Sequence, residues 1–168
     1  MTIHLRRLLE KDAPLMLEWM TDPEIIRFFR FDASHVTADS CRAFIEDANN
    51  RTDTVHFAIA DETDEYLGTI SLKDIDRDRG SAEYAISTRK KAHGTGAAMQ
   101  ATRQVLQYAF ETLGLEQVYL NVLAENGRAN GFYRKAGFHF VREEPAALEL
   151  RGESKALNWY VICKTDWK

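Results

Sequence analysis

The chain has 168 residues, of which 45% are apolar and 29% charged, with a net charge of −4. This length predicts one domain over residues 1–168, and the composition is typical of a globular protein. The acidic balance argues against nucleic acid or an anionic membrane as a partner, and no apolar run approaches the roughly 20 residues that a membrane span needs. We expect no signal peptide, because no apolar segment with a small-residue cleavage site follows Met1.

The first fifty residues show mainly helical periodicity. Residues 3–8 alternate like an edge strand, and residues 11–20 have the broad apolar face of a helix. Pro23 suits the first position of a short helical turn over residues 24–29. A further helix is predicted over residues 37–48, where the apolar side chains share one face.

The remainder of the chain mixes strands and helices. Strands are predicted at residues 55–60, 66–72, 81–88, 118–123, from 138 to 141 onward, and 157–163. A long helix follows residue 96 and ends near Leu113, and a short one covers residues 126–135. A strand, a long helix and a second strand form a β-α-β crossover, so we expect a mixed α/β sheet with helices on both faces.

Cysteine and histidine are placed without a metal-binding or disulfide pattern. Cys41 and Cys163 are far apart in sequence and predict free thiols in a reducing compartment, which points to the cytoplasm. The five histidines show no metal-ligand spacing, so we expect no metal site.

The segment between the strand at 81–88 and the long helix carries two glycines, Gly94 and Gly96. Unpaired backbone N–H groups and the macrodipole favour an anion at a helix start, and glycines let a phosphate approach closely. The spacing matches neither a P-loop nor a dinucleotide-binding fingerprint. A tight strand-to-helix turn with no ligand explains these two glycines equally well on local sequence alone.

Several segments together carry a stronger signal, and they resemble the GNAT superfamily of N-acetyltransferases. They are Ser81-Ala-Glu-Tyr-Ala-Ile, Gly94-Thr-Gly, residues 107–122 and residues 125–138. The ordered set of loop, Asn126 and Phe132-Tyr133-x3-Gly137-Phe138 is the specific part. Leu5-Arg-Arg, Trp19-Met-Thr-Asp-Pro-Glu-Ile and Trp159-Tyr-Val-Ile are similar to the branch with ribosomal-protein N-terminal, spermidine and nucleotide-aminosugar acetyltransferases.

The resemblance implies the GNAT fold, a mostly antiparallel six- or seven-stranded sheet with a splayed central strand pair, and acetyl-CoA as co-substrate. By matching the family motifs, it implies that cofactor is bound by Ile86, Ser87, Thr88, Lys91, Ala92, His93, Gly94, Thr95, Gly96, Ala97 and Asn126. Arg89 and Lys90 either meet the 3′-phosphate of coenzyme A or belong to a solvated turn, and we favour the solvated turn.

The resemblance also implies the catalytic groups. Tyr133 matches the family tyrosine that protonates the departing thiolate, although a helix tyrosine packed on the sheet is the alternative. Some relatives have a glutamate base where this chain has Asn121, so Glu83 remains as the candidate base, acting through water. An exposed cross-strand charge explains Glu83 equally well.

Asn126 is also a plain candidate for the N-cap of its helix, and one side chain can serve both roles. Gly127 and Gly131 weaken that helix by up to about 1 kcal/mol each, so we expect it to be loose before cofactor binds.

The acceptor pocket is expected at residues 24–31 and the nearby strand ends. Its aromatic and cationic residues are Arg27, Phe28, Phe29, Arg30 and Phe31. Stacking on a sugar or base and binding of a phosphate are one interpretation. The interpretation that we favour places Phe28 and Phe29 in the core and the arginines in solvent.

The sequence does not identify the acceptor amine. Candidates are a small-molecule amine such as an aminosugar or polyamine, a protein N-terminus, and an antibiotic or amino-acid amine; the cationic segment argues mildly against a polyamine. No Cys or Ser near the motif has an evident base partner, so we expect direct transfer. A catalytically weak acyl-CoA-binding sensor or assembly domain is the alternative function, and a homodimer is the family default.

Overall fold

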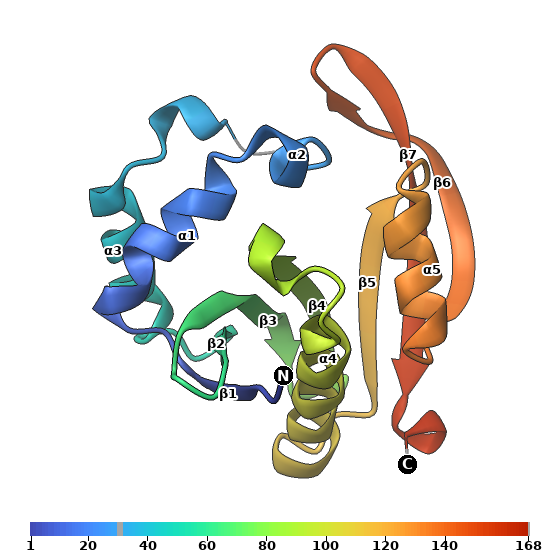
Figure 1. The fold of residues 1–168 in the computed structure, drawn as a ribbon. Helices are drawn as coiled ribbons and strands as arrows, with labels where there is room; N and C mark the ends of the chain where they lie inside the picture. The colour runs from blue at the N-terminus through green and yellow to red at the C-terminus, as the bar shows by residue number, and fades with distance from the viewer. Residues whose placement is uncertain (30–31, 168) are drawn as a thin grey trace.

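The computed structural model describes residues 1–29 and 32–167 (Figure 1). Its strands are β1 (His4–Arg7), β2 (Val55–Ala60), β3 (Tyr66–Asp76), β4 (Ser81–Thr88), β5 (Gln117–Leu123), β6 (His139–Leu150) and β7 (Glu153–Cys163). Its α-helices are α1 (Ala13–Met20), α2 (Pro23–Ile26), α3 (Ala38–Ala48), α4 (Ala97–Gln107) and α5 (Gly127–Lys135). A π-helical turn, Tyr108–Thr112, extends α4 to the end that the sequence predicts.

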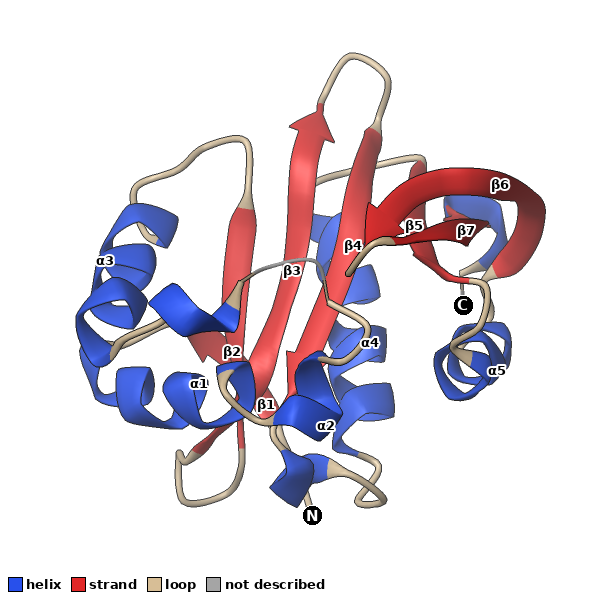
Figure 2. Cartoon of the chain, turned by 90° about the horizontal axis from the view of Figure 1, so that it is seen from above, coloured by secondary structure: helices blue, strands red, loops and turns tan. Residues whose placement is uncertain are grey.

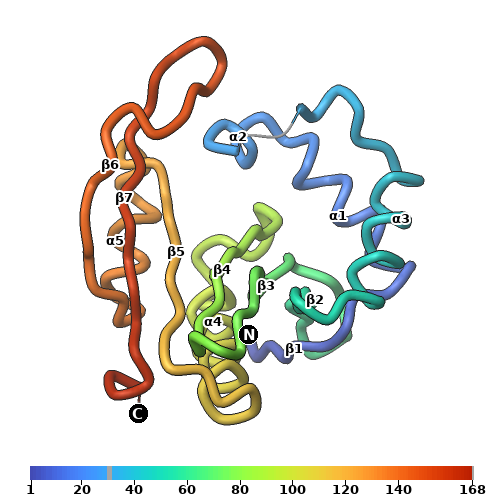
Figure 3. Tube along the Cα trace, turned by 180° about the vertical axis from the view of Figure 1, so that it is seen from behind, coloured from blue at the N-terminus to red at the C-terminus, as the bar shows by residue number. Residues whose placement is uncertain are grey.

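The strands form one seven-stranded sheet in the order β1-β2-β3-β4-β5-β7-β6. Every neighbouring pair is antiparallel except β4 and β5, which are parallel. Their pairing covers only residues 81–83 opposite residues 117–119. Beyond it the two strands diverge (Figures 1 and 3), so the predicted mixed sheet with a splayed central pair is confirmed.

Helices cover both faces of the sheet (Figure 2). On one face α1 and α3 bury an apolar cluster that includes Met16, Trp19 and Tyr66. On the other face α4 and α5 pack over the main core, where the Tyr84 hydroxyl bonds Thr102 of α4 at 2.8 Å. Because side chains alternate along a strand, β4 contributes to both layers. No helix among the described residues has the length and apolar character needed to cross a membrane.

The β6–β7 hairpin is longer than the sequence predicts. Pro145 lies in β6 where the register with β7 shifts, so its missing N–H removes no regular ladder bond. The tip places Arg151 and Gly152 both at positive φ (+51° and +82°), the requirement of a type I′ turn. An arginine at the first of these positions is an uncommon turn residue, so the local sequence does not predict that the strands extend to a tight turn here.

Candidate active site

The glycine turn begins α4 directly after β4. Gly94 has φ +76° and Gly96 has φ +83°, and Gly96 is the N-cap of α4 without a side-chain cap. A Cβ built on Gly94 would meet no atom within 4 Å, so the space above this residue is open. Both glycines are needed for their backbone conformation, and the turn leaves room for a ligand against the main chain.

Hydrogen bonds hold this turn from within and leave amides available. Thr95 Oγ1 donates to Ala92 O at 2.6 Å and accepts from Ala97 N at 3.2 Å. Among the described residues, the amides of Gly94 and Gly96 donate no hydrogen bond to the protein. Unpaired N–H groups at a helix start attract an anion, so this turn has the donors that a diphosphate requires.

The basic residues ahead of the turn differ from expectation. Arg89 is only 7% exposed; it donates to Glu18 Oε2 at 2.7 Å, Glu65 Oε2 at 2.8 Å and Tyr66 O at 2.8 Å. It is therefore neither a solvated residue nor a free phosphate ligand, and both interpretations of Arg89 are corrected. Because Arg89 is buried and bonded to two carboxylates and to a β3 carbonyl, it fixes the turn to α1 and β3.

The lysines beside Arg89 are exposed and also form ion pairs. Lys90 Nζ lies 2.6 Å from Glu24 Oε2, and Lys91 Nζ lies 2.6 Å from Glu65 Oε2. Glu65 therefore holds the Lys91 side chain beside the turn.

The β4 residues Ile86, Ser87 and Thr88 pair with Ile70, Thr69 and Gly68 on β3. On their other side the parallel pairing with β5 has already ended, at residue 83. This strand edge therefore faces the opening between β4 and β5, as the sequence motifs imply. A Cβ on Gly68 would lie 2.4 Å from Ser87 O, so only glycine lets β3 approach β4 this closely.

Tyr133 lies on α5, on the same side of the sheet as α4. Its ring packs edge-on against Tyr84 of β4, with centroids 5.7 Å apart and planes at 86°. Burial raises the pKa of Tyr133 to about 12, so its hydroxyl stays protonated at neutral pH. Tyr133 is therefore packed on the sheet, and its hydroxyl group is protonated, as a general acid must be.

Asn126 is the N-cap of α5: its Oδ1 accepts from Ala129 N at 3.2 Å. One turn later the buried Asn130 donates to Leu123 O at 3.1 Å and accepts from Asn158 at 2.8 Å and Tyr160 at 2.7 Å. These bonds fix α5 to β5 and β7. The helix is continuous over Gly127 and Gly131, and its looseness without cofactor stays a prediction.

Glu83 lies at the last position of β4 that pairs with β5, opposite Tyr119 of β5 and Lys73 of β3. Its Oε2 is 3.3 Å from Lys73 Nζ, so it does form a cross-strand charge pair. Glu83 shares its face of β4 with Ala85 and Ser87, the face towards α1 and α3. Asn121 lies on β5 opposite Trp159.

The expected acceptor segment is only partly described, because Arg30 and Phe31 lie outside the described residues. Phe29 packs edge-on against Trp19 with centroids 5.7 Å apart, and Phe28 packs near Leu123, Leu150 and Leu157. Arg27 is exposed and stacks over the Phe28 ring at 4.5 Å. The two phenylalanines are thus half-buried packing residues.

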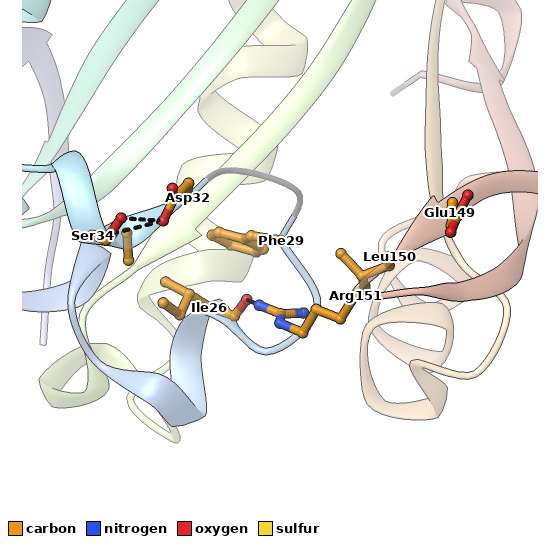
Figure 4. Close-up of a pocket in the computed structure, with 8 residues that line it drawn as sticks. Ile26, Phe29, Asp32, Ser34, Glu149, Leu150 and Arg151 are labelled. Atoms are coloured by element: carbon orange, nitrogen blue, oxygen red, sulfur yellow. Dashed lines mark hydrogen bonds between the residues drawn. The ribbon is translucent and has the colours of Figure 1, made fainter.

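A cavity of about 400 Å³ separates this segment from the β6–β7 hairpin, lined by Ile26, Phe29, Glu149, Leu150 and others (Figure 4). Arg151 at the hairpin tip donates to Arg27 O at 2.8 Å and Ile26 O at 3.3 Å. The hairpin tip therefore contacts the end of α2 and the residue after it across this cavity.

A larger cavity, about 530 Å³, lies between the sheet and helices α1 and α3. It is lined by β4 residues Ala85, Ile86 and Ser87 together with side chains of β2, β3, α1 and α3. Its position on the other side of the same β4 stretch makes it the candidate acceptor cavity. Among the described residues, no three His, Cys, Asp or Glu side chains gather in a way that would hold a metal ion.

A family model described as the acetyltransferase (GNAT) domain matches residues 2–139 of this chain. The chain belongs to the GNAT acetyltransferase family. It is an N-acetyltransferase that uses acetyl-CoA as its co-substrate. The expected family and its branch are thereby confirmed.

The chain is similar to curated N-acetyltransferases in sequence and to a solved spermidine N-acetyltransferase in fold. The chain is 28% identical to an uncharacterized N-acetyltransferase p20 of Bacillus licheniformis, over 73% of this chain and 70% of that protein. It is 30% identical to a spermidine N(1)-acetyltransferase of Escherichia coli (strain K12), over 86% and 72% of the two chains. The spermidine N-acetyltransferase of Vibrio cholerae, solved with CoA and spermine, superimposes with a TM-score of 0.89 at 21% identity, over 98% and 97%.

In this GNAT chain the sequence did not reveal the side chains of the acceptor cavity. His56 Nδ1 lies 2.6 Å from Ser71 Oγ, so a serine of the acceptor cavity has a histidine partner. Burial, with a contribution from Lys73, lowers the pKa of His56 to about 4. The alternation of polar Thr69, Ser71 and Lys73 along β3 was the available signal, because all three point to one face.

Proposed function

We propose that the chain moves the acetyl group of acetyl-CoA directly onto a primary amine, with the diphosphate held by the glycine turn. One observation carries this proposal. The open, positive-φ turn at Gly94 and Gly96 begins α4 where β4 leaves β5, and the protonated Tyr133 packs against that strand.

The binding residues have separate roles in this proposal. Within residues 91–97, the amides of Gly94 and Gly96 donate to the diphosphate, and Lys91 adds a long cationic donor. The β4 edge at Ile86, Ser87 and Thr88 pairs with the pantetheine amides as an added strand would. Asn126 caps α5 through its oxygen, which leaves its NH₂ group to donate to the cofactor.

Acetyl-CoA supplies an acyl group activated as a thioester. The amine nitrogen forms the new C–N bond as the C–S bond breaks, and the leaving sulfur takes the Tyr133 hydroxyl proton. The proton lost by the amine passes through water to Glu83. A backbone N–H of the β4 edge faces the thioester oxygen, where negative charge develops.

Direct transfer fits the nucleophiles that border the acceptor cavity. Burial raises the pKa of the Cys41 thiol, so little thiolate forms. His56, with a pKa of about 4, is too weak a base to take the Ser71 proton. Neither side chain is activated for a covalent acetyl-enzyme.

Release of CoA thiol over a panel of amines, with mass detection of the acetylated product, tests this function. We expect saturable turnover with at least one primary amine. Tight acetyl-CoA binding with no turnover on any amine would instead support the sensor function, and no CoA binding by calorimetry would contradict both.

We further infer that the enzyme acts in the cytoplasm as a homodimer on a small-molecule amine or a protein N-terminus. The free thiols Cys41 and Cys163 support a reducing compartment. Phe140 and Val141, 49% and 54% exposed on the edge strand β6, support an interface there. Light scattering after size exclusion tests the dimer, and a monomer at micromolar concentration would contradict it.

A further inference from the structure

The acceptor cavity adjoins the proposed position of the thioester. Ala85, Ile86 and Ser87 line the cavity, and the edge of this same β4 stretch towards β5 has no paired strand. If the thioester lies along that edge, an amine can reach it from the cavity without crossing the sheet. The chemistry of the cavity lining therefore selects the acceptor.

The helix side of the cavity is mainly apolar. The side chains that α1, α3 and the α2 loop contribute are Met16, Trp19, Met20, Phe29, Cys41 and Phe44, together with the polar Ser40 near the start of α3. The Trp19 Nε1–H donates to Tyr66 OH at 2.9 Å, so that polar group is satisfied inside the protein. These rings and thioethers present carbon and sulfur to a ligand, which favours an apolar body.

The sheet side of the cavity offers hydroxyls and one positive charge. None of the described lining residues is an Asp or Glu, and Lys73 is the lining side chain that is charged at neutral pH. Glu83 is not one of the lining residues, and it pairs with Lys73 at 3.3 Å. Burial keeps His56 neutral above pH 5, since it lowers the pKa to about 4.

The charges in the cavity determine how unfavourable it is to bind each kind of amine there. An ammonium taken from water into an apolar lining is unfavourable unless a carboxylate pairs with it. The reacting amine avoids this cost, because it gives up its proton to become nucleophilic. A second ammonium on the same molecule cannot do so, and it also meets the repulsion of Lys73.

We propose that the acceptor is a primary monoamine on an apolar aliphatic or aromatic body, and that polyamines are poor substrates. This inference rests on the proposed acetyltransferase function. The reaction joins R–NH₂ and the acetyl thioester to give R–NH–CO–CH₃ and CoA thiol, with Tyr133 supplying the thiol proton. It separates this chain from the spermidine acetyltransferases that it resembles in fold.

Two amines of equal size test the inference. Hexylamine and cadaverine have the same number of non-hydrogen atoms and differ by a terminal methyl in place of an ammonium. We expect kcat/KM for hexylamine to exceed that for cadaverine by at least about tenfold, the effect of burying one unpaired charge. Phenethylamine against spermidine repeats the comparison with larger bodies.

A pair of variants tests whether the preference for a monoamine arises from the cavity lining. Ser40 lines the cavity and is the third residue of α3, where its Oγ accepts from Thr37 N at 2.8 Å. Asp is compatible with this helix position, so Ser40→Asp adds a carboxylate without loss of the cap. We expect it to raise the cadaverine-to-hexylamine ratio about three- to tenfold over Ser40→Asn, which has the same shape without the charge.

The outcomes separate the two proposals. Equal or higher kcat/KM for cadaverine or spermidine overturns the monoamine inference and leaves the acetyltransferase function in place. Absence of thiol release with every amine, although acetyl-CoA binds, overturns both.

Discussion

The two sides of β4 build their sites in different ways. Towards β5 and α4, one continuous stretch, residues 86–97, supplies a strand edge and unpaired amides. Towards α1 and α3, the cavity collects side chains from elements far apart in sequence. A site made of backbone depends on conformation, and a site made of side chains depends on which residues the fold brings together.

Gly94→Val is the largest expected disruption of the backbone side. Valine disfavours the positive φ of this position, and its side chain would occupy the open space beside the amides. We expect acetyl-CoA affinity to fall by more than about 100-fold, measured by calorimetry. Gly152→Val is the matched control, because it places the same strain (φ +82°) at an equally open position in the hairpin tip. Equal loss in both variants would show that folding is damaged and would argue against a diphosphate site.

Tyr133→Phe tests the proposed general acid on α5. Removal of the hydroxyl should lower kcat by about 100-fold or more, the usual effect of a general acid, with acetyl-CoA affinity nearly unchanged. Tyr108→Phe, on a half-buried tyrosine packed against Phe57, is the control and should retain wild-type turnover. A parallel fall in affinity and kcat for Tyr133→Phe would identify Tyr133 as a packing residue.

The alkaline limb of the pH profile sharpens the same assignment. Burial raises the pKa of Tyr133 to about 12, so its phenol remains protonated where an ordinary tyrosine has ionised. We expect kcat to show no decline near pH 10 over a range where the enzyme stays folded, checked by circular dichroism. A decline that is centred at pH 10 and absent in Tyr133→Phe would contradict a buried acid.

Much of the backbone side was predictable from sequence, and little of the cavity was. Gly94, Gly96 and Asn126 are local signals, because positive φ and helix capping depend on neighbouring residues. The β4–β5 opening was implied by resemblance and is confirmed by the short pairing of these strands.

The contacts that the sequence missed all depend on distant partners. Arg89 appeared to belong to a solvated basic turn, because its partners Glu18 and Glu65 lie on α1 and beside β3. The contact of His56 with Ser71 arises from the β2–β3 register, which no local pattern specifies. Side-chain sites become visible only when strand pairing is known.

Glu65→Gln measures how far the Glu65 carboxylate competes with the cofactor for Lys91. Glu65 holds Lys91 at 2.6 Å, and this half-exposed ion pair is worth about 0.2–1 kcal/mol. Its removal should therefore tighten CoA binding up to about fivefold at low salt, with a smaller gain at high salt. Glu46→Gln removes the same charge from the exposed face of α3 and should leave affinity unchanged. Weaker binding in Glu65→Gln would mean that Glu65 orders the turn through Arg89.

The last prediction concerns the stability of the cavity side. Since burial lowers the pKa of His56 from 6.5 to about 4, the unfolded chain takes up this proton first as pH falls. This contribution to stability is present above pH 6.5 and is lost between pH 6.5 and 4. Urea unfolding should show a shallower loss for His56→Asn over this window, whereas the exposed His35→Asn should follow the wild type. Identical slopes in all three would contradict a buried neutral His56.

The contact of Arg151 with the carbonyls of Ile26 and Arg27 has a mechanical consequence. The two halves of the sheet pair directly where residues 81–83 lie beside 117–119, and at the far end the β6–β7 hairpin tip contacts α2 through this arginine (Figure 4). Exposed hydrogen bonds of this kind contribute only about 1 kcal/mol each, less than the buried ladder. Any hinge motion that admits or releases a long ligand should therefore start at the hairpin tip and pivot on the parallel pairing.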